Sequence, residues 1–201
     1  MHSAVFLKGL GMGAGLVVAI GTQNAFVLRQ GLQRQYVLSC VCICVVCDVL
    51  LIAAGVAGMG SLIAGHPALL LWIKTAGALF LVGYGMRAAR AAWRPAPPAA
   101  AAAQPPASHL AVATAAFAFS LLNPHVYLDT VILLGSIGGQ QAGAGRWHFA
   151  AGAIVASVLW FISLGFGARL LAPLFARPSA WRVLDALVAL VMWAIALSLF
   201  L

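Results

Sequence analysis

The sequence predicts an all-α membrane protein with six transmembrane helices, arranged as two inverted three-helix repeats in which helices 1 and 4 are broken. Hydrophobic residues make up 64% of the 201 residues and charged residues only 7%, whereas about a quarter of residues are charged in soluble domains. Six spans of about 20 residues each use up nearly the whole chain, which leaves no room for a soluble catalytic domain. Polar and helix-breaking residues interrupt two of the apolar segments, and these interruptions indicate the two broken helices.

The first apolar segment extends from about residue 3 to 28 and contains the polar interruption Gly21-Thr22-Gln23-Asn24. The second segment, from about 36 to 60, carries Asp48 near its middle, and the third, from about 67 to 86, carries Lys74 about two turns from its start. Residues 1–93 therefore form the first predicted three-helix repeat.

A Pro- and Ala-rich stretch, RPAPPAAAAAQPPASH, occupies residues 94–109. It has no apolar periodicity, so we predict a flexible linker there. The second predicted repeat, 110–201, contains apolar segments at about 110–136, 149–171 and 181–201. Asp185 lies one turn into the last and shortest of them.

The interruption in the fourth segment reads LLNPHVYLD and covers residues 121–129. Pro124 has no N–H and crowds the preceding turn, so a helix must break there and leave a carbonyl without its partner. Asp129 costs roughly 2.5–3.5 kcal/mol near the membrane centre, and His125 lies four residues before it, on the same face of an α-helix. We interpret this segment as the wall of a binding site. Paired broken helices, one in each half, are typical of secondary transporters.

The two halves align with each other. Asn24-Ala25-Phe26 matches Asn123-Pro124-His125, residues 45–58 match 154–167, and residues 72–85 match 183–196. Three spans carry the chain across the membrane an odd number of times, so the two halves have opposite orientations, which defines an inverted repeat. This register places Asp48 opposite Ser157 and Lys74 opposite Asp185, and from it we predict that Lys74 and Asp185 form a structural ion pair.

The four cysteines, Cys40, Cys42, Cys44 and Cys47, lie within one apolar segment, so they are not a disulfide framework. Cys40, Cys44 and Cys47 share a helix face beside Asp48, which leaves a thiol-based metal transport protein as an alternative. Buried cysteines usually act as small apolar residues, and we predict no metal and no cofactor. The chain contains no HExxH or GxSxG motif, which argues against an enzyme.

Three blocks of residues carry a resemblance to a known family: GTQNAFVLRQGL at 21–32, CDVLLI at 47–52 and LLNPHVYLDTVILLGSIG at 121–138. The chain resembles the lysine exporter (LysE) superfamily, and most closely its arginine exporter (ArgO) branch. The resemblance implies export of L-arginine, with L-lysine as a second candidate, across a bacterial inner membrane. Homoserine and threonine exporters share the overall pattern and remain an alternative. Their pattern resembles Pro-Gly-Pro-Asn and Asn-Pro-Lys, where this chain has Gly-Thr-Gln-Asn and Asn-Pro-His.

Candidate site residues follow from the polar groups placed inside the spans. We expect Asp48 and Asp129 to recognise a cationic substrate or carry protons, because a carboxylate accepts paired hydrogen bonds from a guanidinium. Gln23, Asn24 and Asn123 are expected to bind the substrate's amino and carboxylate groups, with interhelical hydrogen bonding as the alternative. His125 together with Asp129 is the predicted site of proton coupling.

The formal charge of +8 comes from basic residues that fall mostly at segment ends, so it predicts a topology rather than a nucleic-acid partner. The expected partners are a small basic amino acid and the lipid bilayer, and the sequence is compatible with a homo-oligomer. Loops one, three and five hold most of the 11 basic residues, and we therefore expect both termini outside and the linker in the cytoplasm. The basic residues in these loops are Arg29, Arg34, Arg87, Arg90, Arg94, Arg169, Arg177 and Arg182.

Overall fold

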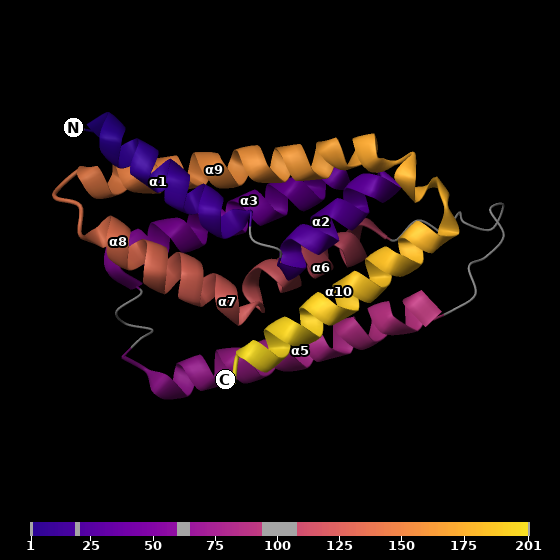
Figure 1. Ribbon diagram of the computed structural model, residues 1–201. Coiled ribbons are helices and arrows are strands. Elements are labelled where there is room, and N and C mark those ends of the chain that lie inside the picture. The colour runs from indigo at the N-terminus through magenta and orange to yellow at the C-terminus, as the bar shows by residue number, and fades with distance from the viewer. Residues whose placement is uncertain (1, 19–20, 60–64, 94–107, 201) are drawn as a thin grey trace.

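The structure is a computed structural model that describes residues 2–18, 21–59, 65–93 and 108–200 (Figure 1). All regular secondary structure in these residues is helical, which confirms the predicted all-α class. Nearly all of the predicted linker lies outside the described residues. The elements are α1 (His2–Val17), α2 (Thr22–Gln33), α3 (Val37–Ala54), η1 (Gly55–Met59), α5 (Pro67–Trp93), α6 (His109–Leu121), α7 (Pro124–Val126), η3 (Tyr127–Leu134), α8 (Gly135–Gly139), α9 (Gly145–Gly167), η4 (Ala168–Leu171), η5 (Leu174–Ala176) and α10 (Pro178–Ser198).

Several of these helices are long and apolar enough to cross a membrane. Within the described residues, three segments meet this standard, namely Val37–Met59, Gly145–Leu171 and Ser179–Ser198. The helices α1 and α2, which are inclined to each other by 78°, make a fourth if they are counted as one bent span. His109–Leu121 and Tyr127–Gly139 are shorter apolar helices. The protein therefore passes through the membrane several times.

Both predicted interruptions coincide with helix ends. The first helix stops at Val17, and a new one begins at Thr22 after Gly21, whose backbone is extended (φ −125°, ψ 171°). The second break lies between α6, which ends at Leu121, and α7, which begins at Pro124. Proline is well suited to a first helical position because its missing N–H would have no intrahelical partner there.

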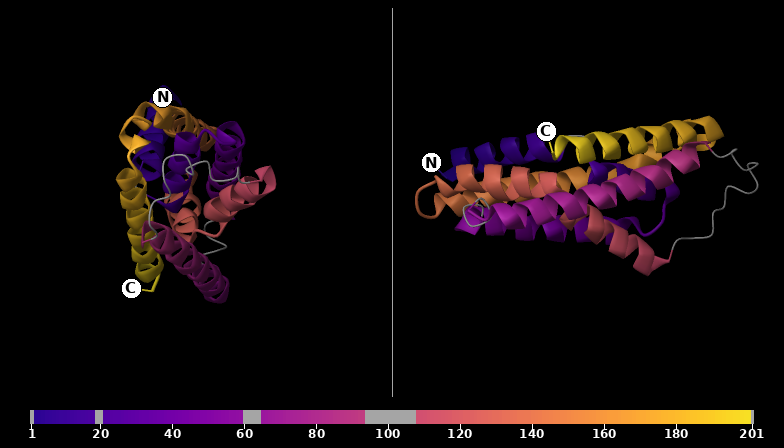
Figure 2. Two further views of the ribbon diagram at one scale, coloured as in Figure 1. Left: turned by 90° about the vertical axis from the view of Figure 1, so that its right-hand side faces the viewer. Right: turned by 90° about the horizontal axis from the view of Figure 1, so that it is seen from below.

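Helix α1 lies along α9 in close contact (Figures 1 and 2). A Cβ atom added to Gly13 would lie 2.7 Å from the Cα atom of Ala153, and one added to Gly152 would overlap the carbonyl oxygen of Phe6. Only glycine permits this approach, which is the small-residue packing that membrane helices use when water provides no driving force between them.

A cluster of aromatic rings packs α2, α5 and α6 together next to the two breaks. Phe119 of α6 lies 5.0 Å from Phe26 of α2, 5.1 Å from Phe80 and 4.6 Å from Tyr84, both of α5, measured between ring centroids. Phe119 is fully buried. This cluster joins three helices and fixes the position of α2 and α6 where they reach the breaks.

Helices α5 and α10 pack side by side and run antiparallel. Near one end the Nε atom of Arg182 donates to the carbonyl oxygen of Ala92 at 3.0 Å, and farther along Gly85 packs against the Trp193 side chain. Helix α5 continues to Trp93, seven residues beyond the predicted end of the third segment at 86.

The predicted ion pair between Lys74 and Asp185 is wrong. Asp185 is paired instead with Arg29 of α2, with 2.6 Å between the guanidinium Nη1 and the carboxylate Oδ1. Because α5 and α10 are antiparallel, the residues of α5 beside Asp185 are about 16 positions from Lys74, or roughly 24 Å along the helix. The repeat alignment predicted that the two residues occupy equivalent positions, but equivalent positions of an inverted repeat would lie at opposite ends of antiparallel helices and not in contact.

Arg29 also lies outside the loop to which the sequence assigned it. Helix α2 continues to Gln33, so Arg29 is two turns inside the helix, and the turn to α3 begins at Arg34. The Arg29 side chain is 20% exposed and that of Asp185 is 9% exposed. The pair therefore fastens the segment after the first break to the last helix.

We predict that Asp185→Asn lowers the thermal stability of the purified protein, because it leaves the partly buried Arg29 charge without its counter-charge, a loss of about 1.5–3 kcal/mol. The exchange Arg29→Asp with Asp185→Arg should recover part of this loss, and Lys74→Gln should have little effect. Thermal unfolding in detergent measures all three. An equal loss in Lys74→Gln and Asp185→Asn would contradict this assignment of the pair.

Candidate functional site

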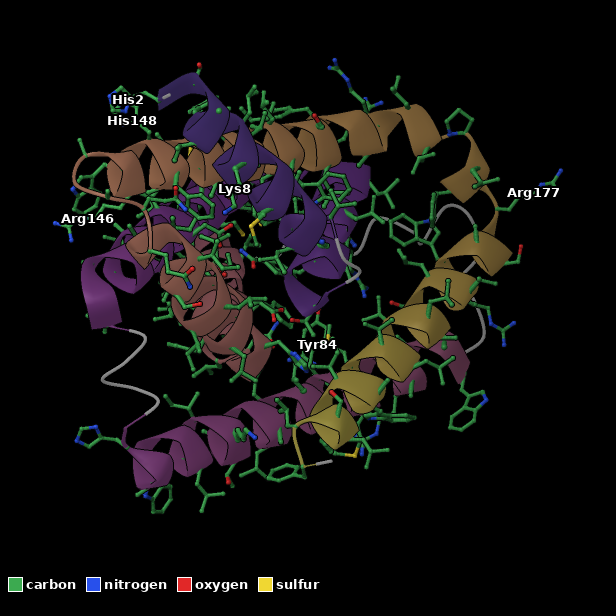
Figure 3. All side chains as sticks on the ribbon, turned by 60° about the vertical axis from the view of Figure 1, so that its left-hand side comes forward. His2, Lys8, Tyr84, Arg146, His148 and Arg177 are labelled. Atoms are coloured by element: carbon green, nitrogen blue, oxygen red, sulfur yellow. The ribbon has the colours of Figure 1, made fainter. Side chains whose placement is uncertain are left out.

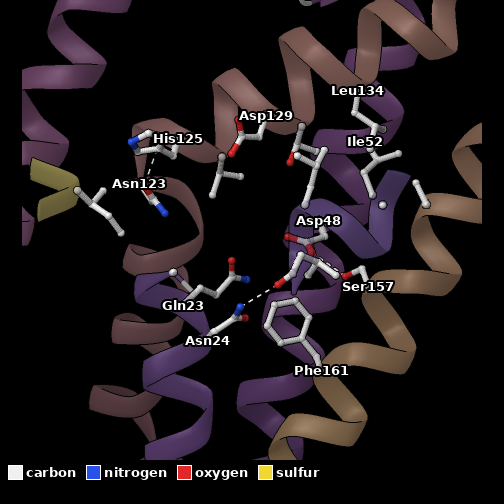
Figure 4. Close-up of a pocket in the computed structure, with 18 of the residues that line it drawn as sticks. Gln23, Asn24, Asp48, Ile52, Asn123, His125, Asp129, Leu134, Ser157 and Phe161 are labelled. Carbon is white, nitrogen blue, oxygen red and sulfur yellow. Dashed lines mark hydrogen bonds between the residues drawn. The ribbon is translucent and has the colours of Figure 1, made fainter. Parts of the chain in front are cut away.

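A cavity of about 430 Å³ lies between the two helix breaks (Figure 4). All six residues that the sequence predicted for substrate binding or proton coupling line this one cavity, although they come from three separate parts of the chain. They are Gln23 and Asn24 of α2, Asp48 of α3, Asn123 at the second break, His125 of α7 and Asp129 of η3. Thr130 of η3, Ser157 of α9 and Ser198 of α10 complete its polar wall.

Hydrogen bonds join the two breaks to each other. The Nε2 atom of Gln23 donates to the Oγ atom of Ser120 at 3.1 Å, and the Nδ2 atom of Asn123 lies 3.4 Å from the Oγ1 atom of Thr22. All four side chains are buried, and Thr22 and Ser120 are fully so. Each break thus supplies partners for the polar groups of the other.

Asn24 and Asn123 also satisfy the backbone at their own breaks. The Nδ2 atom of Asn24 donates to the carbonyl oxygen of Val17, the last residue of α1, at 2.8 Å, and its Oδ1 atom accepts from Trp160 Nε1 at 3.1 Å. The Oδ1 atom of Asn123 accepts from the backbone N–H of His125 at 3.2 Å and so caps α7. Asn24 and Asn123 therefore make hydrogen bonds between helices, which the sequence analysis gave as the alternative to substrate binding.

Asp48 lies at the bottom of the cavity and is 8% exposed. The hydroxyl of Ser157 donates to its Oδ2 atom at 2.6 Å, so the residue that the predicted repeat alignment places opposite Asp48 is its hydrogen-bond partner. Within the described residues, Arg29–Asp185 is the one ion pair, and Asp48 is therefore bound by a neutral hydroxyl rather than by a cation.

Asp129 is half-buried, and Figure 4 shows its carboxylate directed into the same cavity as that of Asp48. It belongs to η3, a π-helical stretch, and no hydrogen bond or ion pair of the described residues joins it to His125, although both residues line this cavity. The Nε2 atom of His125 instead lies 3.0 Å from the Oγ atom of Ser198 in α10. The structure thus gives His125 a hydrogen-bond partner that the sequence did not predict.

Comparison with known proteins shows the family of this chain. The model of the family described as LysE type translocator matches residues 14–201. A proposed amino-acid transporter of Mycobacterium tuberculosis strain H37Rv is 51% identical over 181 residues, which cover 90% of this chain and 89% of the relative. The arginine exporter protein ArgO of Yersinia enterocolitica is 42% identical and that of Serratia proteamaculans 41% identical, each over 98% of this chain and 96% of the relative. No solved structure matches the chain.

The chain belongs to the LysE family of translocators. This membership makes it a transporter rather than an enzyme, and with its several apolar helices it is a multi-pass protein of the bacterial inner membrane. The resemblance that the sequence blocks suggested is confirmed, and the cavity between the breaks is its candidate substrate site.

The cysteines of this LysE-family chain pack behind that site. Cys40, Cys44 and Cys47 are buried and carry free thiols. The hydroxyl of Ser120 lies 3.9 Å from the Sγ atom of Cys44, next to the Gln23 contact. The described residues contain no group of three side chains placed to hold a metal ion. Cys44 thus packs beside the hydrogen bond between Gln23 and Ser120 that joins the two breaks.

Among the polar residues of the site that sequence reasoning missed are Thr22, Ser120, Trp160 and Ser198. Thr22 lies in the recognised interruption, and Ser120 comes one turn before Pro124, so proximity to a break could have indicated both. Trp160 and Ser198 lie in uninterrupted apolar segments, where one polar atom is an ordinary occurrence. Only the three-dimensional arrangement brings them to the breaks.

Proposed function

We propose that this LysE-family translocator exports L-arginine, with L-lysine as a second substrate, out of the bacterial cytoplasm. The observation that carries the proposal is that two carboxylates, Asp48 and Asp129, face one cavity and neither is paired with a lysine or arginine of the described residues. A cavity of about 430 Å³ lies within the range of small-molecule sites. The relatives named arginine exporters support the same substrate.

Each group of arginine has a complementary partner in this cavity. The guanidinium suits the carboxylates of Asp48 and Asp129, which can accept paired, charge-assisted hydrogen bonds. The α-carboxylate suits the N-terminus of α2, where Gly21, Gln23 and Asn24 line the cavity and first-turn N–H groups have no intrahelical partner. Gln23 and Asn123 are the neutral side chains beside it and complete the proposed contacts to the amino and carboxylate groups.

The Asp48→Asn and Asp129→Asn variants are each expected to abolish export while still inserting in the membrane. Loss of a charge-assisted bond of about 1.5–3 kcal/mol weakens cation binding by roughly ten- to a hundredfold. Asp129→Glu, which keeps the charge, is the matched control and should retain part of the activity. The assay is intracellular arginine in cells that are fed an arginine dipeptide. Wild-type export by both amide variants, or equal export of homoserine or threonine, would reject recognition of the cationic side chain.

Within this proposal the transporter has six spans in two inverted repeats: α1–α2, α3–η1 and α5, then α6–α8, α9 and α10. The packing supports this scheme. When each element of one repeat is exchanged for its proposed equivalent in the other, a contact between two helices becomes another contact that the structure also contains. Helix α1 packs on α9 as α6 packs on α3, and α2 packs on α9 as η3 packs on α3.

The basic residues indicate the orientation. Arg177 lies at the end of the molecule opposite His2, Arg146 and His148 (Figure 3). The end that contains Arg177 also contains the α2–α3 turn with Arg34 and the end of α9 with Arg169. We propose that this end is cytoplasmic and that both termini are outside.

Single cysteines introduced into a variant without native cysteines test this topology. Ala101→Cys, in the linker, should react with a membrane-impermeant maleimide only after the cells are opened. Gln140→Cys, in the exposed turn between α8 and α9, should react in intact cells. The reverse labelling pattern would invert the proposed orientation, and labelling of both from one side would contradict the six-span scheme.

Export of a cation from a cell that is negative inside is opposed by about 2.3 kcal/mol per charge per 100 mV, so an inward flux of another cation is required. We propose protons as that cation. Asp129 and His125, which line the cavity beside the second break, are the proposed proton carriers. A carboxylate that binds either a proton or a guanidinium couples the two movements directly.

Reconstituted in vesicles, the protein should move arginine against its gradient when a pH difference is imposed. His125→Ala should slow this pH-driven movement several-fold, and Ser198→Ala, which removes only the hydrogen-bond partner, should slow it less. Exchange of labelled for unlabelled arginine needs no proton and should persist in both variants. Arginine flux that ignores both the pH difference and the membrane potential would favour uniport instead.

A further inference from the structure

A second, smaller pocket lies away from the substrate cavity and shares no residue with it. It has a volume of about 300 Å³ and lies between the α2–α3 turn and the end of α9. Its lining consists of Gly31, Arg34, Val37, Gly165, Phe166 and Arg169. The two walls touch beside the pocket, where a Cβ atom on Gly31 would overlap the carbonyl oxygen of Gly165. The pocket is therefore built on a tight contact between α2 and α9.

Two guanidinium groups in this pocket, those of Arg34 and Arg169, have no acidic side chain as a partner among the described residues. The whole sequence has three acidic residues, Asp48, Asp129 and Asp185. The first two line the substrate cavity, and the third is bound to Arg29. Arg34 and Arg169 are both exposed, and no described carboxylate forms an ion pair with either of them. With all three acidic side chains placed elsewhere, an anion from outside the protein can neutralise this pair of arginines.

The backbone holds Arg34 at the mouth of the pocket in an unusual conformation. Arg34 is left-handed, with φ 55° and ψ 31°, and its N–H closes α2 by bonding to the carbonyl oxygens of Gln30 and Gly31. Glycine or asparagine adopts this conformation more readily. The side chain therefore starts from a fixed point beside Arg169 and not from a flexible loop.

The position of the pocket in the membrane identifies the class of anion. It lies where one candidate span, Val37–Met59, begins and another, Gly145–Leu171, ends, which is the depth of lipid headgroups. From there the exposed apolar side chains of Leu38 on α3 and of Phe166 and Ile162 on α9 continue toward the membrane interior. A phosphate at the pocket and an acyl chain along this apolar surface would match both parts.

We propose that the Arg34–Arg169 pocket binds the headgroup phosphate of an anionic glycerophospholipid. Arginine holds phosphate through paired, charge-assisted hydrogen bonds, and basic pockets between membrane helices are suited to acidic headgroups. The lipid supplies the negative charge that this end of the chain lacks, and its acyl chains cover the adjacent apolar face. The bound lipid thereby joins the segment after the first break to α9 at the protein surface.

Native mass spectrometry of the full-length protein tests the proposal with phosphatidylglycerol and phosphatidylethanolamine of identical acyl chains. The wild type should retain phosphatidylglycerol preferentially. The double variant Arg34→Asn with Arg169→Gln should bind it about 25-fold more weakly, since each basic residue near a membrane surface contributes a factor of about five. Asparagine is chosen at position 34 because it tolerates the left-handed backbone.

Three controls make the outcome decisive. Arg34→Lys with Arg169→Lys keeps both charges and should keep the preference, and Arg146→Gln, at the opposite end, should not alter it. If the double variant cannot be isolated, Arg169→Gln alone should lower the affinity about fivefold. Undiminished phosphatidylglycerol binding by the Arg34→Asn, Arg169→Gln protein would overturn the proposal. Displacement of the lipid by millimolar inorganic phosphate would overturn it in favour of a free-anion site.

Discussion

The two helix breaks can exist only because their backbone groups find partners without water. In lipid each unsatisfied N–H or carbonyl costs several kcal/mol, so a broken span needs polar side chains beside it. Asn24 supplies one for the carbonyl of Val17, and Asn123 supplies one for the N–H of His125. The contacts Gln23–Ser120 and Thr22–Asn123 then bind one break to the other. The groups that stabilise the breaks are the ones that make the cavity between them polar.

Charge is neutralised differently at the cavity and away from it. Asp185 receives the guanidinium of Arg29, a cation from a distant helix, whereas Asp48 receives the neutral hydroxyl of Ser157. A hydroxyl stabilises a buried carboxylate with a hydrogen bond but leaves its charge in place. A serine rather than a cation as the partner of Asp48 thus keeps a negative charge available to a ligand, which a salt bridge at that site would neutralise.

The breaks and the lining of the cavity could be predicted from the sequence because Asn123-Pro124 and Gln23-Asn24 interrupt apolar runs. A polar group in such a run is costly in lipid unless it has a hydrogen-bond partner or binds a ligand. Contacts between helices could not be predicted in the same way. The predicted repeat alignment placed Lys74 and Asp185 at matching positions, which says nothing of contact. The antiparallel packing of α5 and α10 separates the two residues. His125 and Asp129 do line one cavity, but the hydrogen bond of His125 goes to Ser198 of α10, a residue that nothing in the sequence connects with the second break. Arg29 resembled a loop residue only because nothing in the sequence shows that α2 continues to Gln33.

The scarcity of acidic residues restricts how such a chain could couple two fluxes. With Asp185 held by Arg29, Asp48 and Asp129 are the only carboxylates left in the whole sequence, and both face the same cavity. A transporter with separate carboxylate sites for cargo and proton would need further acidic residues, and the sequence holds none; His125, the other proposed proton carrier, lines the same cavity. Competition of both cations for the same two carboxylates is the simplest coupling that this composition allows, and it needs no domain outside the membrane.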